Sequence, residues 1–139
     1  MAYATQSNLI ERFGEQELID ILPGEGPETI DAALVTVALD DATNEINTYL
    51  AERFTLPLEE TPPVLVQVTC DIARYKYYSV HATDEVKERY DARIKWLKSV
   101  VDGKAGLAFT NQPESSLTGN YAKRSSNNRL FTCDTLKGF

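Results

Sequence analysis

The side chains that most often catalyse reactions are sparse in this sequence. His81 is the only histidine, so a Ser-His-Asp or Cys-His arrangement would have to use it. It stands beside Ala82-Thr83, at an expected junction between helices where capping and surface roles are commoner, and no nucleophile motif accompanies it. Cys70 and Cys133 lie far apart and fit neither a metal-ligand spacing nor a disulfide framework. The sequence therefore predicts no catalytic residue and no metal ligand.

The acidic pairs have structural explanations. Asp40-Asp41 would be neighbours on a helix, and neighbours on a helix do not face the same way. Asp84-Glu85 suit the first turn of a helix, where carboxylates complement the helix dipole. Glu59-Glu60 suit a solvated loop. None of the three pairs predicts general acid-base chemistry.

Two glycine motifs superficially resemble phosphate-binding loops. Gly24-x-Gly26 is followed by Pro27 and is preceded by no strand. Gly103-Lys104 lacks the upstream glycine and the following Ser or Thr of a P-loop. We therefore expect no cofactor, and we expect that the protein is not an enzyme.

Helical signals dominate residues 1–103. Thr5 or Ser7 can cap a short helix that ends at Phe13, and Gly14 would terminate it. Thr83 can cap a later helix that ends before Gly103. No segment within residues 1–103 alternates apolar and polar side chains over the length of a strand. These signals predict an all-α fold: a small bundle of about five helices, two of them short, at about 5–13, 15–22, 28–54, 63–79 and 84–102.

The third expected helix is the longest, with Thr29 as its candidate cap. Its apolar residues recur every four positions and predict one buried stripe. The stripe comprises Ile30, Leu34, Ala38, Ala42, Ile46, Leu50 and Phe54, widened by Val37 and Tyr49. For the fourth helix the predicted buried stripe is Leu65, Val68, Ile72 and Tyr75, and for the fifth it is Val86, Tyr90, Ile94, Leu97 and Val101.

The character of the chain changes at Gly103. Residues 104–139 show no sustained helical period and are rich in Ser, Thr, Asn and Gly, yet they carry many large apolar side chains. We predict a helical connector body over 1–103 and an extended C-terminal docking arm over 104–139, which can add short strands near 106–110 or 129–133. The arm residues expected to bind a partner are Phe109, Leu117, Tyr121, Lys123, Arg124, Arg129, Leu130, Phe131, Leu136 and Phe139.

Charge divides the chain at the same point. Basic residues outnumber acidic ones by three in 104–139. Because the formal net charge of the whole chain is −7, residues 1–103 carry −10. An acidic body does not resemble a sequence-specific nucleic-acid binder, whose folded face should be basic. The basic arm could meet the acidic body of a neighbouring copy, or it could be only a mobile, mildly basic terminus. No run of 18 apolar residues predicts a membrane span, no signal peptide is visible, and the default compartment is the cytoplasm.

The densest aromatic cluster is Tyr75, Tyr77 and Tyr78. The helical spacing directs Tyr75 to the core, and Tyr77 and Tyr78 cannot fully share its face. At least one of the latter two is therefore a candidate inter-subunit contact, because tyrosine is favoured at interfaces. The alternative is that both cover the helices of their own domain.

The order of several motifs resembles a small protein family of Mu-like phages and prophages. The opening motifs are Tyr3-Ala4-Thr5, residues 8–14 with the sequence NLIERFG, and Glu17-Leu18. The central motif is CDIARY at 70–75, followed by Val86, Arg89-Tyr90, Ile94, Leu97 and Gly103-Lys104. The ending motifs are Arg129-Leu130-Phe131 and residues 136–139 with the sequence LKGF. The resemblance spans nearly the whole chain and rests on packing motifs rather than catalytic ones.

This family looks similar to the head-tail connector, or adaptor, proteins of long-tailed phages. The resemblance implies a helical subunit of a virion ring beneath the portal protein, commonly of twelve copies and assembled in the host cytoplasm. It implies an arm that reaches the portal or an adjacent copy, and another face that receives the next neck or tail protein. Family members often carry a basic residue where this chain has Cys133.

Two alternatives remain open at this stage. A head-completion stopper or a tail terminator would also be a ring protein of similar size. The first two helices could instead form a helix-turn-helix of a DNA-binding regulatory module. Against that, the acidic residues Glu11, Glu15, Glu17 and Asp20 stand where a recognition helix should be basic.

Overall fold

The structure, a computed structural model, describes residues 1–108. Its helices are α1 (Gln6–Phe13), α2 (Glu15–Ile21), α3 (Ala32–Leu50), α4 (Pro63–Tyr78) and α5 (Asp84–Val101), with a 3₁₀ turn at Ser79–His81. Across 1–108 there is no strand, only an isolated bridge between Pro23 and Ile30. The predicted all-α bundle of five helices, two of them short, is confirmed.

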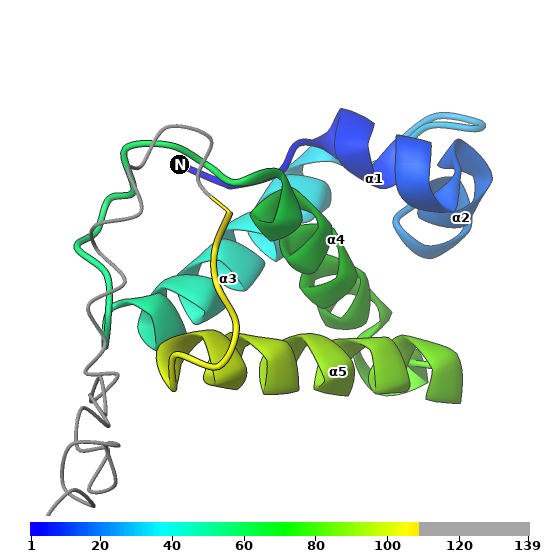
Figure 1. The fold of residues 1–139 in the computed structure, drawn as a ribbon. Coiled ribbons are helices and arrows are strands. Elements are labelled where there is room, and N and C mark those ends of the chain that lie inside the picture. The colour runs from blue at the N-terminus through cyan, green and yellow to red at the C-terminus, as the bar shows by residue number, and fades with distance from the viewer. Residues whose placement is uncertain (109–139) are drawn as a thin grey trace, which may run out of the picture.

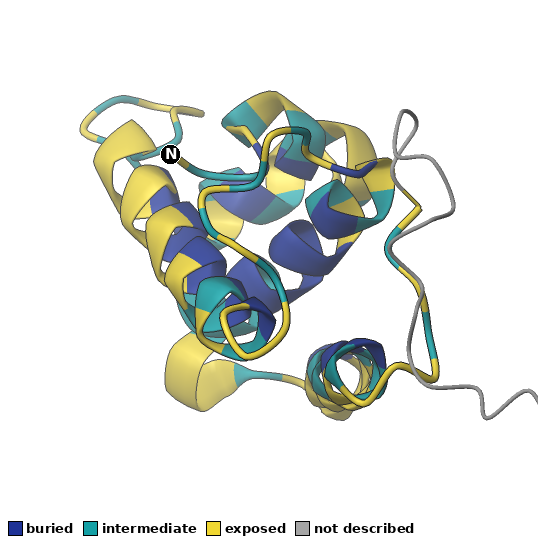
Figure 2. Cartoon of the chain, turned by 60° about the vertical axis from the view of Figure 1, so that its left-hand side comes forward, coloured by how far each residue is buried: buried dark blue, intermediate teal, exposed yellow. Residues whose placement is uncertain are grey.

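The three long helices form the body of the molecule. In Figure 1, α3, α4 and α5 lie along the sides of a triangle. Helices α1 and α2 lie outside the triangle, to the right of α4. Each long helix contacts the other two, and α1 contacts both α3 and α4. The buried residues, dark blue in Figure 2, lie on the sides of the helices that face the interior. Fully buried large side chains in this core include Leu9, Leu18, Ile46, Leu50, Leu65, Ile72 and Leu97.

Most of the predicted helix ends are confirmed. The Thr5 N–H and hydroxyl both donate to Oδ1 of Asn8, at 2.9 and 3.0 Å, and close the start of α1. Gly14 ends α1 with a φ of 89°, a conformation that favours glycine. The Thr83 hydroxyl accepts a bond from the Val86 N–H at 3.4 Å and caps α5.

The predicted start of the third helix is wrong. The helix begins at Ala32 and not near residue 28, and its cap is Asp31, whose carboxylate accepts from the Ala33 and Leu34 N–H groups. Thr29 is unavailable as a cap because its hydroxyl bonds with the backbone of Gly26 in the preceding loop. Glu28 has a φ of 54°, outside the helical region. The helix also ends at Leu50, four residues earlier than predicted.

The buried stripe of α3 is rotated from its predicted position. Leu34 and Val37 were expected in the core but are 48% and 56% exposed. Val35 and Leu39 are buried instead. The lower half of the stripe, from Ala38 through Ile46 to Leu50, is buried as predicted. The physical reason is that the helices packed against α3 cover its Val35 side and leave its Leu34 side open.

The middle of α4 is buried on every side. Six consecutive residues, from Val68 to Ala73, are buried, although the sequence predicted a single stripe. The reason is that α1, α3 and α5 all pack around this helix. Buried Asp71 lies within this stretch and needs a partner for its charge.

The chain reverses after α5. Gly103 has a φ of 79°, and the backbone N–H groups of Lys104 and Ala105 both donate to the Ser99 carbonyl. Ala105 and Leu107 then pack against the core of the body. The first residues of the predicted arm thus lie on the helical body, and from Phe109 onward the arm lies outside the described residues.

Candidate functional site

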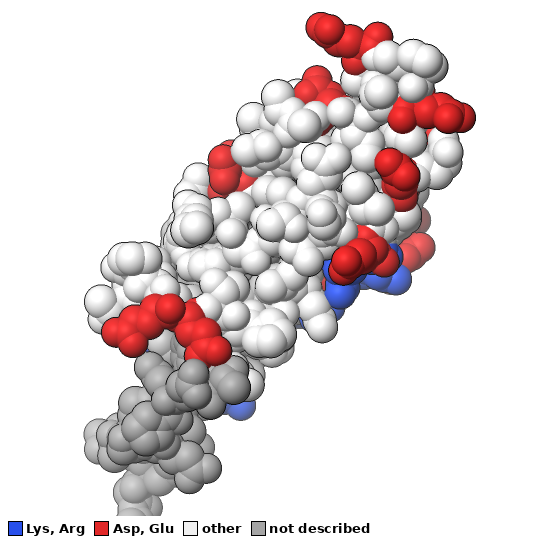
Figure 3. All heavy atoms as spheres, turned by 90° about the horizontal axis from the view of Figure 1, so that it is seen from above, with Lys and Arg blue, Asp and Glu red and all other residues white. Residues whose placement is uncertain are grey.

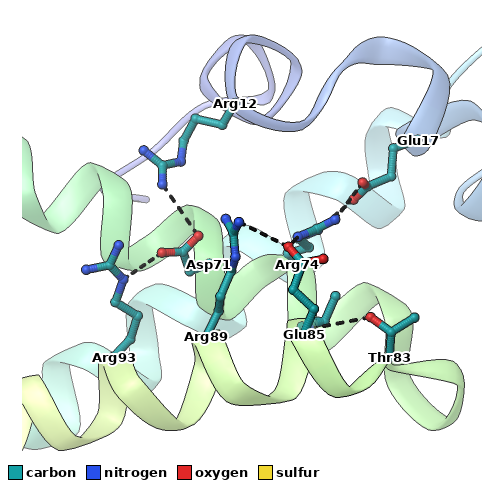
Figure 4. Close-up of polar contacts among 9 residues, drawn as sticks. Arg12, Glu17, Asp71, Arg74, Thr83, Glu85, Arg89 and Arg93 are labelled. Atoms are coloured by element: carbon teal, nitrogen blue, oxygen red, sulfur yellow. Dashed lines mark hydrogen bonds and ion pairs between the residues drawn. The ribbon is translucent and has the colours of Figure 1, made fainter.

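A buried carboxylate lies where α1, α4 and α5 meet. Asp71 of α4 has a side chain only 1% exposed. The Nε of Arg93 on α5 donates to its Oδ2 at 2.6 Å, and the Nη2 of Arg12 on α1 lies 3.5 Å from its Oδ1 (Figure 4). The carboxylate therefore ties three helices together, and two guanidinium groups balance its buried charge.

A second ion pair joins α2 to α4. Arg74 donates from Nε and Nη2 to the two carboxylate oxygens of Glu17, each at 2.8 Å, in the two-bond geometry that only arginine offers (Figure 4). Both side chains are largely buried. The Tyr77 hydroxyl donates to the same carboxylate at 3.1 Å. Glu85 of α5 adds a longer contact, 3.8 Å from Nη1 of Arg74.

Aromatic rings enclose the Arg74 guanidinium. Its central carbon lies 4.5 Å from the ring centre of Phe13 and 5.7 Å from that of Tyr78, within the range of cation–π attraction. The rings of Tyr77 and Tyr78 stack with their centres 5.5 Å apart. Arg74 thus holds α1, α2 and α4 together through both charge and ring contacts.

A third cluster joins α3, α4 and α5. The Tyr90 hydroxyl donates to Oε1 of Glu45 at 2.6 Å, and the Lys76 ammonium lies 2.6 Å from Oε2 of the same carboxylate. The Tyr75 and Tyr90 rings stack with centres 4.1 Å apart. The three clusters together make a polar network that connects all five helices.

The pKa values of two tyrosines and one arginine in this network are raised, away from neutral pH. Burial, and then the Glu17 charge, raise the pKa of Tyr77. Burial, and then the bond to Glu45, raise the pKa of Tyr90. The hydrogen bond to Glu17 raises the pKa of Arg74. Because every shift moves away from pH 7, these groups are suited to fixed contacts and not to proton transfer.

The residues that sequence reasoning singled out for chemistry are not brought together. His81 is exposed in the 3₁₀ turn, and Cys70 is buried in α4, where burial raises the pKa of its thiol to about 11. Within residues 1–108, no group of three or more His, Cys, Asp or Glu side chains could hold a metal ion. No helix in this part of the chain is long and apolar enough to span a bilayer.

The predicted contact residues fall in two places. Tyr77 and Tyr78 are half-buried, and Tyr77 packs against the core of its own body. Their role between subunits stays a prediction. The arm residues predicted to bind a partner, which are Phe109, Leu117, Tyr121, Lys123, Arg124, Arg129, Leu130, Phe131, Leu136 and Phe139, all lie outside the described residues.

The polar network was missed by sequence reasoning. Arg12 and Asp71 are 59 positions apart, and Glu17 and Arg74 are 57 apart, so no local spacing reveals either pair. The one available signal was the pair Asp71 and Arg74, charged residues at i and i+3 within the otherwise uncharged stretch 64–75. That signal indicates polar groups near the core without naming their partners.

The surface of the body is acidic and carries isolated apolar groups. In the view of Figure 3, Asp and Glu side chains surround a broad uncharged area, and few Lys or Arg side chains are visible. Exposed large apolar side chains among the described residues are Met1, Leu34, Val37 and Val80. Within residues 1–108, this surface and the buried network are the candidate functional features.

Residues 3–124 match the protein family described as Bacteriophage Mu, Gp36. The chain belongs to this family. It is 34% identical over 137 residues to the Mu-like prophage FluMu protein gp36 of Haemophilus influenzae, and the match covers 99% of this chain and 97% of that protein. It is 33% identical over 123 residues to Gene product J of Escherichia phage Mu, covering 86% and 85% of the two chains. The resemblance to a Mu-like phage family is thereby confirmed, and the protein is a phage protein.

The motifs that carried the resemblance meet in the fold of this family member. Arg12 and Glu17 come from the opening motifs, Asp71 and Arg74 from the central one, and Tyr90 from the next. In the structure these residues form the polar network between the helices. Motifs spread along the chain therefore act together to set the relative positions of the helices.

Proposed function

We propose that this protein is a head-tail connector, or adaptor, subunit of the virion, forming a ring between the portal protein and the next neck or tail protein. The observation that carries the proposal is membership of the Mu Gp36 family along nearly the whole chain. The ring contains twelve copies, matches the portal, and is assembled in the host cytoplasm.

The construction of the body supports this role. Ion pairs from Asp71 and Arg74 fix the short helices α1 and α2 against α4 and α5. Groups that hold one geometry suit a subunit whose faces must match neighbouring subunits. The proposal accordingly assigns the protein no catalytic activity.

The arm sequence supports docking on partners. Phe109, Leu130, Phe131, Leu136 and Phe139 supply apolar anchors, and Lys123, Arg124 and Arg129 supply positive charge. In a ring each arm contact is repeated by symmetry, so a modest affinity per subunit is multiplied. The partners proposed for these anchors are the portal and adjacent copies of this chain.

A DNA-binding role is less well supported. One face of α2 lies against α4 through the Glu17 contacts with Arg74 and Tyr77, and the exposed residues of α2 include Glu15 and Asp20. A recognition helix needs a free, basic face. A salt-dependent titration with DNA is expected to show no binding.

The arm is tested by deletion in a phage that carries this gene. Removal of residues 123–139 should leave a body with the helical circular dichroism of the full chain, and should yield filled heads that do not join tails. The matched control replaces Ser125 and Ser126 with alanine, which leaves the apolar anchors intact and should preserve infectivity. Infectious particles at the normal yield from the deletion would overturn the arm's role.

Ring assembly is tested by sedimentation. The isolated full chain should sediment as a monomer and form a ring only when portal is added, because the portal supplies the arm's docking site. A map of the assembled particle separates the adaptor from a head-completion stopper or a tail terminator. Contact between this chain and the portal supports the adaptor, and its absence supports one of the other ring roles.

A further inference from the structure

An apolar pair is exposed on the first half of α3. Leu34 and Val37 are 48% and 56% exposed, and they lie one helical turn apart on the same side of the helix. The remaining exposed large apolar groups of residues 1–108 are at the N-terminus, Met1, and in the turn after α4, Val80. The α3 pair is therefore the one place in this part of the chain where two such groups share a helix face.

Carboxylates border the same face. Asp41 follows Leu34 by seven positions and Val37 by four, so it continues the face one turn further along the helix, and Asp40, three positions after Val37, lies at its edge. Both are exposed, and neither forms an ion pair with another residue in 1–108. The helix contains no Lys or Arg of its own. We call the four residues Leu34, Val37, Asp40 and Asp41 the α3 face.

The chemistry of this face calls for an occupant that is both apolar and basic. A second helical body is a poor occupant, because residues 1–103 carry a charge of −10 and two bodies repel. The end of the same chain has the required character: Arg129-Leu130-Phe131 places a positive charge beside two large apolar groups. Lys137 and Phe139 repeat that combination.

We propose that the C-terminal segment 129–139 docks on the α3 face. Leu130 and Phe131 cover Leu34 and Val37, and Arg129 lies beside Asp40 and Asp41. The apolar contact supplies the affinity. The charges favour this basic segment over an acidic occupant.

The chain is long enough to make this contact. Twenty residues separate Ala108, the last described residue, from Arg129. Fully extended, such a stretch spans up to about 70 Å. This reach allows the segment to dock on its own body or on a second copy.

Cys133 provides a native probe for docking, because it lies within the proposed segment. In the full chain, Val37→Cys places a second accessible thiol on the α3 face, whereas Cys70 is fully buried. Under mild oxidation, a disulfide between positions 37 and 133 should form at least about tenfold faster than with an undocked thiol, because docking raises the local concentration. Peptide mapping by mass spectrometry identifies the linkage.

The matched control is Ala92→Cys, at an exposed position on α5 outside the α3 face. Its linkage to Cys133 should be slow. Adding Leu130→Asp and Phe131→Asp to Val37→Cys should reduce the rate to the control level. Equal rates for the two single variants, or no effect of the aspartates, would overturn the docking proposal.

A mixture of isotopically labelled and unlabelled chains, oxidised with and without added portal, shows where the docked segment comes from. Linkage between differently labelled chains places it on a second copy, as the ring requires, and this assignment alone rests on the proposed function. Linkage within one chain supports the docking and counts against arm exchange between copies. A ring that forms although the segment does not dock contradicts only the docking proposal. Docking in a protein that forms no ring contradicts only the proposed function.

Discussion

Glu17 of α2 and Arg74 of α4 face each other across the body and share two hydrogen bonds of 2.8 Å each. Tyr77 donates a third bond to the same carboxylate, and the Phe13 ring lies against the guanidinium. The pair is largely shielded from water, so its charges are weakly screened. Helix α2 is only seven residues long and depends on such contacts to hold its place.

Replacement of Glu17 by alanine should lower the free energy of unfolding by about 2 kcal/mol, because it removes three charge-assisted bonds and leaves the largely buried Arg74 without a hydrogen-bonded carboxylate. Chemical denaturation of the full chain measures the change. The control is Glu25→Ala, in the exposed loop after α2, which should change stability by less than about 0.5 kcal/mol. Equal effects of the two substitutions would show that the Glu17 contacts are not formed in solution.

The two arginines around Asp71 should contribute unequally. Arg93 donates a 2.6 Å hydrogen bond, whereas Arg12 approaches only to 3.5 Å. Asp71→Ala should cost about 3 kcal/mol, as expected when one partner of a buried ion pair is removed. Double-mutant cycles with Arg93→Met and Arg12→Met should give the larger coupling energy for Arg93. A larger coupling for Arg12 would contradict the geometry at this site.

Gly103→Ala should destabilise the protein by about 1–2 kcal/mol, because a side chain at a positive φ is strained. The new Cβ would also lie 2.9 Å from Nη1 of Arg53, which donates to the Val100 carbonyl at the end of α5. Gly106→Ala is the matched control, since a Cβ there meets open space and Gly106 has no positive φ. Thermal unfolding of the two variants decides the point, and equal melting temperatures would refute it.

The stability of the protein should fall between pH 9 and pH 11. Burial raises the pKa of the Cys70 thiol from 9.0 to about 11, so the folded state favours the neutral thiol. That stabilisation is complete below pH 9 and is lost as the pH rises through the folded-state value. Within this window the loss approaches about 1.4 kcal/mol per pH unit for one group. Unfolding free energies measured across pH 8–11 should fall less steeply in Cys70→Ala than in the parent; identical slopes would exclude the contribution.

Local chemistry was enough to predict the helices and most of their ends. The Thr5–Asn8 pair, Gly14 and Thr83 work through atoms within a few residues of themselves, so their effect is readable in the sequence. Thr29 misled the prediction because the hydroxyl of a good capping residue can also serve a loop, here the one at Gly26. The spacing of apolar residues likewise predicted a third helix without establishing its starting point.

Which face of each helix is covered was decided by the tertiary structure. Leu34 and Val35 are both apolar and adjacent, so helical period alone does not determine which of the two faces the core. The same holds for the charged residues of α4, whose partners Arg12 and Glu17 lie more than fifty positions away. The sequence by itself determined an all-α body of five helices and its kinship with Mu-like phage proteins. The packing of distant helices decided which apolar groups remained exposed and which charges were paired, because burial depends on neighbours that no local pattern specifies.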